Sequence, residues 1–116
     1  MMLAPGPARK VIIHLNEDVS STRDFLHCEI LEFLYAKGVA GASVIRPIAG
    51  FGAHHQIHTV GAGSVEGEHL PLRIEFLETD EKVDRILPEL CALINDGLVE
   101  MHPTTVIKSA RGTETI

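Results

Sequence analysis

The sequence predicts an α+β fold of the ferredoxin-like type, with elements in the order β-α-β-β-α-β. Four segments have the β-branched or alternating composition of strands, and two carry apolar residues at helical spacing. The two halves of the chain repeat the same pattern of strand, helix, glycine and strand. Right-handed crossovers then place both helices on one face of a four-stranded antiparallel sheet. The 116 residues suffice for one such domain, which we place at residues 9–108.

The first half is expected to contain a strand at 9–16, which is rich in valine and isoleucine. Residues 1–8 include two prolines and a glycine, and they are expected to form a disordered lead-in. Hydroxyl side chains at 20–22 can cap the helix that follows, and apolar residues then recur at helical spacing up to Gly38.

A second strand is expected at 42–48, and it contains Pro47. Proline cannot donate a hydrogen bond to a neighbouring strand, so this strand should lie at an edge of the sheet or be bulged. Residues 49–69 then hold five glycines and four of the seven histidines. A segment of this length between two strands is usually functional or mobile, and we interpret it as a long loop.

In the second half, residues 70–77 alternate between apolar and charged side chains, as in a strand with one buried face. Asp80 is expected to cap the second helix, whose apolar stripe contains Pro88, a residue that should kink or split it. A last strand is expected at 98–107, followed by a loose tail at 109–116. The sheet face opposite the helices is expected to be bare and apolar, and therefore covered by another copy of the chain.

Composition excludes several classes of function. The net charge of −6 and the 4% of aromatic residues argue against nucleic-acid binding. No apolar run suggests a signal peptide or a membrane-inserted segment, so a cytoplasmic protein is expected. Cys28 and Cys91 are expected to be buried, reduced thiols, and Glu75 and Glu78 to be solvated. No nucleophile–base spacing or paired carboxylates indicate an enzyme.

Two groups of residues are candidates for ligand binding. Gly50 and Gly52 flank Phe51, and glycines let a backbone approach a ligand closely, although they also suit a simple strand exit. Arg46 could bind a phosphate or carboxylate, or it could pair with Glu75 or Glu78. His54, His55 and His58 could hold a transition metal, or they could be ordinary polar loop residues. His14 and His102 could be neighbours in the sheet and form a pH-sensitive contact, or they could be structural.

The sequence resembles the PII-like family that is catalogued as domain of unknown function 190. The resemblance spans about residues 10 to 108 and is carried by several short motifs: Gly38-Val39-Ala40-Gly41-Ala42, Gly50-Phe51-Gly52-Ala53-His54, Ile57-His58-Thr59, Leu70-Pro71-Leu72, Leu87-Pro88-Glu89-Leu90 and Gly97-Leu98-Val99. It implies the fold of nitrogen-regulatory PII proteins. Those are homotrimers that bind nucleotides between subunits and report them to a target through a long loop after the second strand.

The resemblance implies a signalling protein that senses a small ligand, with an adenine nucleotide as the candidate. The ligand residues it implies are Arg46, Gly50, Phe51, Gly52, His54 and His58. It also implies a partner protein, with a membrane channel or transporter as a candidate. One departure is clear: PII proteins have a glycine-rich, lysine-containing phosphate loop where this chain has only Asn95-Asp96-Gly97-Leu98.

Two alternatives stay open at this point. One is a metal-binding trimer that resembles the divalent-cation-tolerance proteins and uses His54, His55 and His58. The other is a structural adaptor that binds no small ligand.

Overall fold

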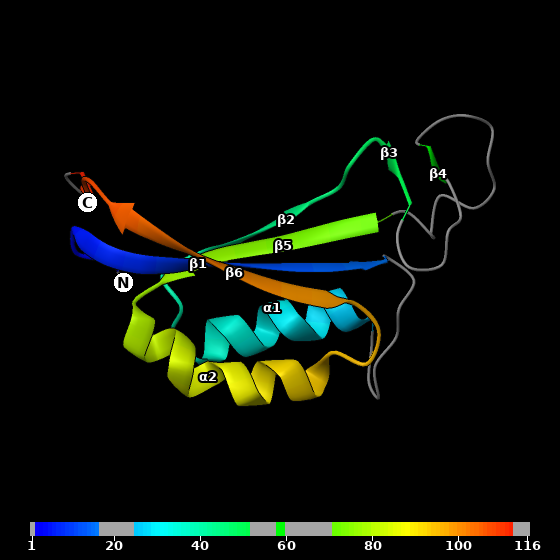
Figure 1. The fold of residues 1–116 in the computed structure, drawn as a ribbon, viewed down its shortest axis with the longest axis horizontal. Helices are drawn as coiled ribbons and strands as arrows, with labels where there is room; N and C mark the ends of the chain where they lie inside the picture. Colours follow the sequence, from blue (N-terminus) through cyan, green and yellow to red (C-terminus); the bar gives the residue numbers. More distant parts are fainter. Residues whose placement is uncertain (1, 17–24, 52–57, 60–70, 113–116) are drawn as a thin grey trace, which may run out of the picture.

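The fold is a four-stranded antiparallel sheet with two helices packed on one face (Figure 1). The computed structural model describes residues 2–16, 25–51, 58–59 and 71–112. Strands lie in the order β2-β5-β1-β6, and every pair is antiparallel. The predicted fold class is thereby confirmed. The elements are β1 (Gly6–Asn16), α1 (Leu26–Ala36), β2 (Ala42–Ile45), β3 (Ala49–Gly50), β4 (His58–Thr59), β5 (Pro71–Glu78), α2 (Asp80–Leu93) and β6 (Leu98–Val106).

The core lies between the sheet and the helices. In β1 and β5 every second side chain is buried, because alternate residues of a strand point to opposite faces. These side chains pack against the apolar stripes of both helices, and full burial of each contributes about 1.5–3 kcal/mol. The core cluster contains Val11, Ile13, Leu15, Leu26, Ile30, Leu34, Ile74, Phe76, Val83, Ile86 and Leu90.

Helix α1 ends in the way that its glycine predicts. Gly38 has φ +73°, and its N–H donates to the carbonyl of Tyr35. The N–H of Val39 donates to the carbonyl of Leu34, which completes a Schellman motif. At the other end, Phe25 is the N-cap residue and contributes no side-chain hydrogen bond. The capping hydroxyls expected at 20–22 lie outside the described residues.

Helix α2 differs from the expectation at its start and in its middle. Thr79, not Asp80, is the N-cap, and its hydroxyl accepts a hydrogen bond from the N–H of Lys82 at 3.3 Å. Asp80 is instead the first helical residue, where a negative charge favours the positive end of the helix dipole. The helix runs through Pro88 without a break, so the proline does not split it. Cys91 is exposed on this helix, so the expectation of a buried thiol is wrong there; Cys28 is partly buried.

The start of β1 and the end of β2 each differ from the expectation by three residues. β1 begins at Gly6, which pairs with Val106, so residues 6–8 are part of the sheet rather than of a lead-in. β2 ends at Ile45, three residues early. β2 is an edge strand, as Pro47 predicts, and the proline lies just beyond its end. Within the described part of the chain, neither helix is long and apolar enough to cross a membrane.

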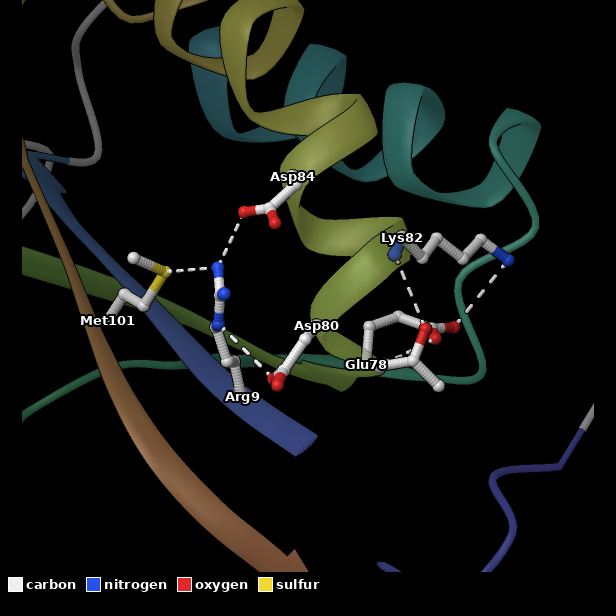
Figure 2. Close-up of polar contacts among 7 residues, drawn as sticks. Arg9, Glu78, Asp80, Lys82, Asp84 and Met101 are labelled. Carbon is white, nitrogen blue, oxygen red and sulfur yellow. Dashed lines mark hydrogen bonds and ion pairs between the residues drawn. The ribbon is translucent and has the colours of Figure 1, made fainter. Parts of the chain in front are cut away.

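A buried carboxylate joins three segments of the fold. Glu78 is only 3% exposed, so the expectation that it is solvated is wrong. Its Oε1 accepts a hydrogen bond from the N–H of Ala40 at 3.0 Å, and its Oε2 accepts one from the N–H of Thr79 at 2.9 Å. The ammonium of Lys82 lies 3.6 Å from Oε1 (Figure 2). The same ammonium also donates a hydrogen bond to the carbonyl of Gly38. The turn after α1 is therefore held against the start of α2.

Arg9 connects β1 to α2 on the helix-covered face. Its Nε lies 3.2 Å from Asp80, and its guanidinium lies 2.6 Å from Asp84 (Figure 2). The sulfur atom of Met101 in β6 lies 3.7 Å from the same guanidinium. The hydrogen bond to Asp84 raises the pKa of Arg9, so this residue stays charged at all ordinary pH values. One side chain thus crosslinks two strands and a helix.

The open face of the sheet is not apolar, and that expectation is wrong. Lys10 lies 2.8 Å from Glu75, which also lies 3.1 Å from Arg73. His14 and Glu100 form a further pair at 2.8 Å. These side chains alternate along their strands with the buried core residues, so they occupy the face away from the helices. The open face therefore carries ion pairs among its apolar residues.

Replacing Glu78 tests whether the buried carboxylate holds the fold together. Glu78→Ala leaves the N–H of Ala40 and the ammonium of Lys82 without this acceptor, so we expect a loss of about 3 kcal/mol in the free energy of unfolding. Urea unfolding followed by circular dichroism measures it. Glu89→Ala removes an exposed pair with Lys37 and should cost less than about 0.5 kcal/mol. Equal losses in the two variants would contradict the structural role of Glu78.

Candidate functional site

A cleft of about 500 Å³ opens where β1 ends and where β5 and β6 begin. It is lined by residues 14–16, 71–73 and 96–98, together with Pro47, Phe51 and Glu100. Antiparallel pairing places the end of β1 beside the starts of both neighbouring strands, so three distant parts of the sequence meet there. Pro47 and Phe51 come from the segment that follows β2.

The predicted ligand residues are only partly brought together. Phe51 lines the cleft and is 61% exposed, so its ring is accessible to a ligand. Gly50 lies beside the cleft, because a Cβ atom there would be 3.4 Å from Cγ of Pro71. Gly50 also pairs with His58 across the short β3–β4 ribbon. Arg46 is exposed and lies next to the lining residue Pro47 without lining the cleft itself.

Part of the predicted site lies outside the described residues. Gly52, His54 and His55 are among the residues that are not described. Of His58, the structure describes only the backbone. The metal-site hypothesis for His54, His55 and His58 therefore stays a prediction. Among the residues that the structure does describe, no group of three histidine, cysteine or acidic side chains is arranged to hold a metal ion.

A cluster of two histidines and one carboxylate borders the cleft. His14 Nε2 lies 2.8 Å from Oε2 of Glu100, and His102 Nε2 contacts the other carboxylate oxygen. The hydrogen bond from His102 and then that from His14 lower the pKa of Glu100. Glu100 was missed by the sequence analysis, although its spacing of two from His102 places both on one face of a strand.

A second charged group lies farther along the same face. The hydrogen bond from Lys10 lowers the pKa of Glu75, and Arg73 acts in the same direction. The Glu75 side chain is only 14% exposed, so it is paired and largely shielded rather than solvated. Both carboxylates considered as partners for Arg46 are thus engaged by other cations: Glu75 by Lys10 and Arg73, and Glu78 by Lys82. Arg73 reaches the cleft, so this group contributes a guanidinium to its wall.

Gly97 makes the closest backbone approach in the cleft. Its φ is +154°, and a Cβ atom at this position would lie 2.6 Å from the carbonyl oxygen of His14. Only glycine fits such a contact without displacing one of the two strands. The turn after α2, which lacks the lysine of PII phosphate loops, is therefore packed directly on β1.

The lining suits a ligand with a flat apolar part and an anionic part. Phe51, Pro47 and Pro71 provide apolar surface, whereas Arg73 and His14 provide groups that can bind an anion. A larger groove of about 850 Å³ lies at the end of α1 and is lined by residues within 31–42. Among the described residues that line it, only Glu32 is charged, so this groove offers less to an anionic ligand.

Comparisons with known proteins agree with this architecture. Residues 8–106 match the model of the family DUF190, which is described as uncharacterized. A UPF0166 protein of Methanocaldococcus jannaschii is 29% identical over 106 residues, which cover 87% of this chain and 93% of that protein. A UPF0166 protein of Aquifex aeolicus is 30% identical over 95 residues, covering 82% and 89%.

Among solved structures, this chain is similar to CPII of Thiomonas intermedia K12. CPII is described as a nitrogen regulatory PII-like protein, and its structure holds ADP, AMP and bicarbonate. The TM-score is 0.65 at 19% identity, and the match covers 90% of this chain and 92% of CPII. At this level of identity the similarity establishes the fold.

The acid sensitivity of the open face can be tested at Glu75. The pKa of Glu75 is lower in the folded protein than in the unfolded chain. Its ion pairs therefore stabilise the fold fully at pH values above the pKa that Glu75 has when unfolded. This stabilisation is lost as the pH falls through the pKa that Glu75 has when folded. Glu75→Gln should therefore be less stable than the natural protein at about pH 7, and the difference should close below about pH 4. Urea midpoints across this range measure it.

Glu89→Gln, which breaks only an exposed pair, is the control and should give a much smaller difference at neutral pH. A difference for Glu75→Gln that stays constant down to acid pH would contradict the assignment of a lowered pKa.

The close approach at Gly97 can be tested with one methyl group. In Gly97→Ala the new Cβ meets the carbonyl oxygen of His14, so we expect a loss of about 1–3 kcal/mol and a melting temperature several degrees lower. Gly41→Ala is the matched control, because a Cβ atom there has no neighbour within 4 Å. Equal melting temperatures for the two variants would show that β1 and the turn can separate freely.

Proposed function

This chain belongs to the DUF190 family and has the PII-like fold, and from these two facts we propose that it is a signalling protein that senses an adenine nucleotide. The ligand would bind in the cleft at the ends of β1, β5 and β6. Residues 49–69 would then engage or release a target protein in response. In this proposal the protein is a cytoplasmic binding protein rather than an enzyme.

One observation carries the proposal: Phe51 lines the same cleft as the turn at 96–98 and the ends of two strands. A ligand in this cleft would contact the first residues of the 49–69 segment and the sheet at once. Ligand binding could therefore change the segment, because the contact is direct and needs no transmission through the core. The nucleotides present in CPII support adenine nucleotides as the first ligands to test.

The residues suit a nucleotide with few phosphates. Phe51 can stack on a base, and Arg73 and His14 can bind an anion. The turn at 95–98 carries no lysine or arginine that could neutralise a long phosphate chain. We therefore propose ADP or AMP ahead of a triphosphate. Arg46, Gly50, Gly52, His54 and His58 remain the further ligand residues of this proposal.

We further propose that the protein acts as a homotrimer, as the resemblance to PII proteins implies. The open face of the sheet is suited to contact between copies, because Lys10, Arg73 and Glu75 are paired within the face. Burying them against another copy would not leave a charge without a partner. The target protein would then meet up to three copies of the 49–69 segment, and a membrane channel or transporter is the candidate target.

The ligand proposal is tested by removing the Phe51 ring. A ligand at 100 times its dissociation constant should stabilise the protein by about 2.7 kcal/mol, which a thermal-shift measurement detects. Phe51→Ala should weaken ADP binding by at least about fivefold, because stacking on an aromatic ring contributes about 1–3 kcal/mol per base. Isothermal titration with ADP measures the affinity.

Tyr35→Ala is the control, since Tyr35 is 90% exposed and lines the other groove. Equal ADP affinity in the two variants would remove Phe51 from the site. If only first-row metals stabilise the protein, and His54→Ala with His58→Ala abolishes this effect, the metal-binding alternative replaces the nucleotide proposal. No effect from any small ligand would favour the structural adaptor.

A further inference from the structure

We propose that proton binding at the cluster of His14, Glu100 and His102 controls how tightly the cleft binds an anionic ligand, with tighter binding at lower pH. The inference rests on the proposed function, because it concerns the same cleft. It adds a second input to the sensor: the protein would respond to the nucleotide and to pH together.

The cluster is placed to act on the cleft directly. His14 and Glu100 both line it, and His102 contacts the carboxylate of Glu100 from the next position on the same strand face. In a single copy of the chain, the side chains of His14, Glu100 and His102 are 43%, 37% and 55% exposed, so protons can exchange with water at all three there. A histidine normally changes its charge between about pH 5 and pH 8.

The surrounding charges determine the direction of the effect. With neutral histidines, the described lining of the cleft includes two carboxylates, Glu100 and Asp96. Arg73, the guanidinium in this described lining, lies 3.1 Å from Glu75 and is partly neutralised by it. An anionic ligand is therefore repelled at alkaline pH.

Among the described residues, the strand pairing places two cations beside the cluster: Arg73 of β5 lies opposite His14, and Lys10 lies opposite His102. Lys10 is already paired with Glu75 at 2.8 Å, so it does little to offset Glu100. Each proton taken up by His14 or His102 adds one positive charge beside Glu100. The first proton neutralises the cluster and the second makes it positive, so the repulsion of an anionic ligand from the cleft weakens as the pH falls.

The test measures ADP affinity by isothermal titration at pH 8.0 and pH 6.0. The terminal phosphate of ADP also titrates near pH 6, so ADP itself contributes to any change with pH. The diagnostic quantity is therefore the dissociation constant at pH 8.0 divided by that at pH 6.0, compared between the natural protein and its variants. The double variant His14→Gln with His102→Gln keeps Glu100 charged at both pH values. Its ratio should be smaller than that of the natural protein by about tenfold.

Two further variants sharpen the result. Glu100→Gln removes the repelling charge and should bind ADP more tightly than the natural protein at pH 8.0, by about threefold to tenfold. Glu89 lies on α2 and does not line the cleft. The variant Glu89→Gln should therefore give the same ratio as the natural protein. It controls for a general change in net charge.

The possible outcomes separate the two proposals. If the natural protein and the double histidine variant give the same ratio, the cluster does not control the cleft, while ADP binding itself still supports the proposed function. If the natural protein binds no ADP at either pH, the proposed function fails and this inference fails with it. A ratio that falls in the double variant and persists in Glu89→Gln supports the inference.

Discussion

The buried carboxylate of Glu78 is the constraint on which the arrangement of sheet and helices depends. A buried anion must be fully hydrogen-bonded, and here the donors are the N–H groups of Ala40 and Thr79, with Lys82 nearby. These donors belong to the turn before β2 and to the start of α2. The carboxylate is therefore satisfied only when the edge strand and the second helix are both in place, which couples their positions to the central strands.

This coupling also fixes the cleft at the opposite end of the sheet. β5 begins at Pro71 beside the cleft and ends at Glu78, seven residues later. β1 is held at its own far end by Arg9, which reaches Asp80 and Asp84. The walls of the cleft are thus the ends of strands whose other ends are anchored by charged contacts. In a ligand site built in this way, the strand ends form one side, and Pro47 and Phe51 from the segment after β2 form another.

The sequence predicts the architecture well because the relevant signals are local. Alternation in β5 and the glycine after α1 act over a few residues, and both predictions are confirmed. Glu78 was misjudged as solvated, although it continues the buried series Leu72, Ile74 and Phe76 with the same spacing of two. That spacing was the available signal, and the charge of the side chain concealed it, because carboxylates are rarely buried without partners. Those partners come from other segments, which periodicity cannot show.

The site was less predictable for the same reason. Phe51 was identified through a short motif, whereas Arg73, Asp96 and Glu100 reach the cleft only through the pairing of distant strands. His14 and His102 are not cross-strand partners, since they lie opposite Leu98 and Lys10. Both instead contact the carboxylate of Glu100, which the sequence did not indicate as their common partner.

The register of β1 has a consequence for how this chain can evolve. Because β1 pairs on both sides and its side chains alternate between faces, one inserted residue between Arg9 and His14 would exchange the two faces beyond the insertion. His14 would then enter the core, and Ile13 and Leu15 would reach the open face. Substitutions can therefore tune the charge of the cleft one residue at a time, whereas a change of length in this strand would destroy the core and the cleft together. Descendants of this sequence should vary in their residues at His14 while conserving the spacing between it and Arg9.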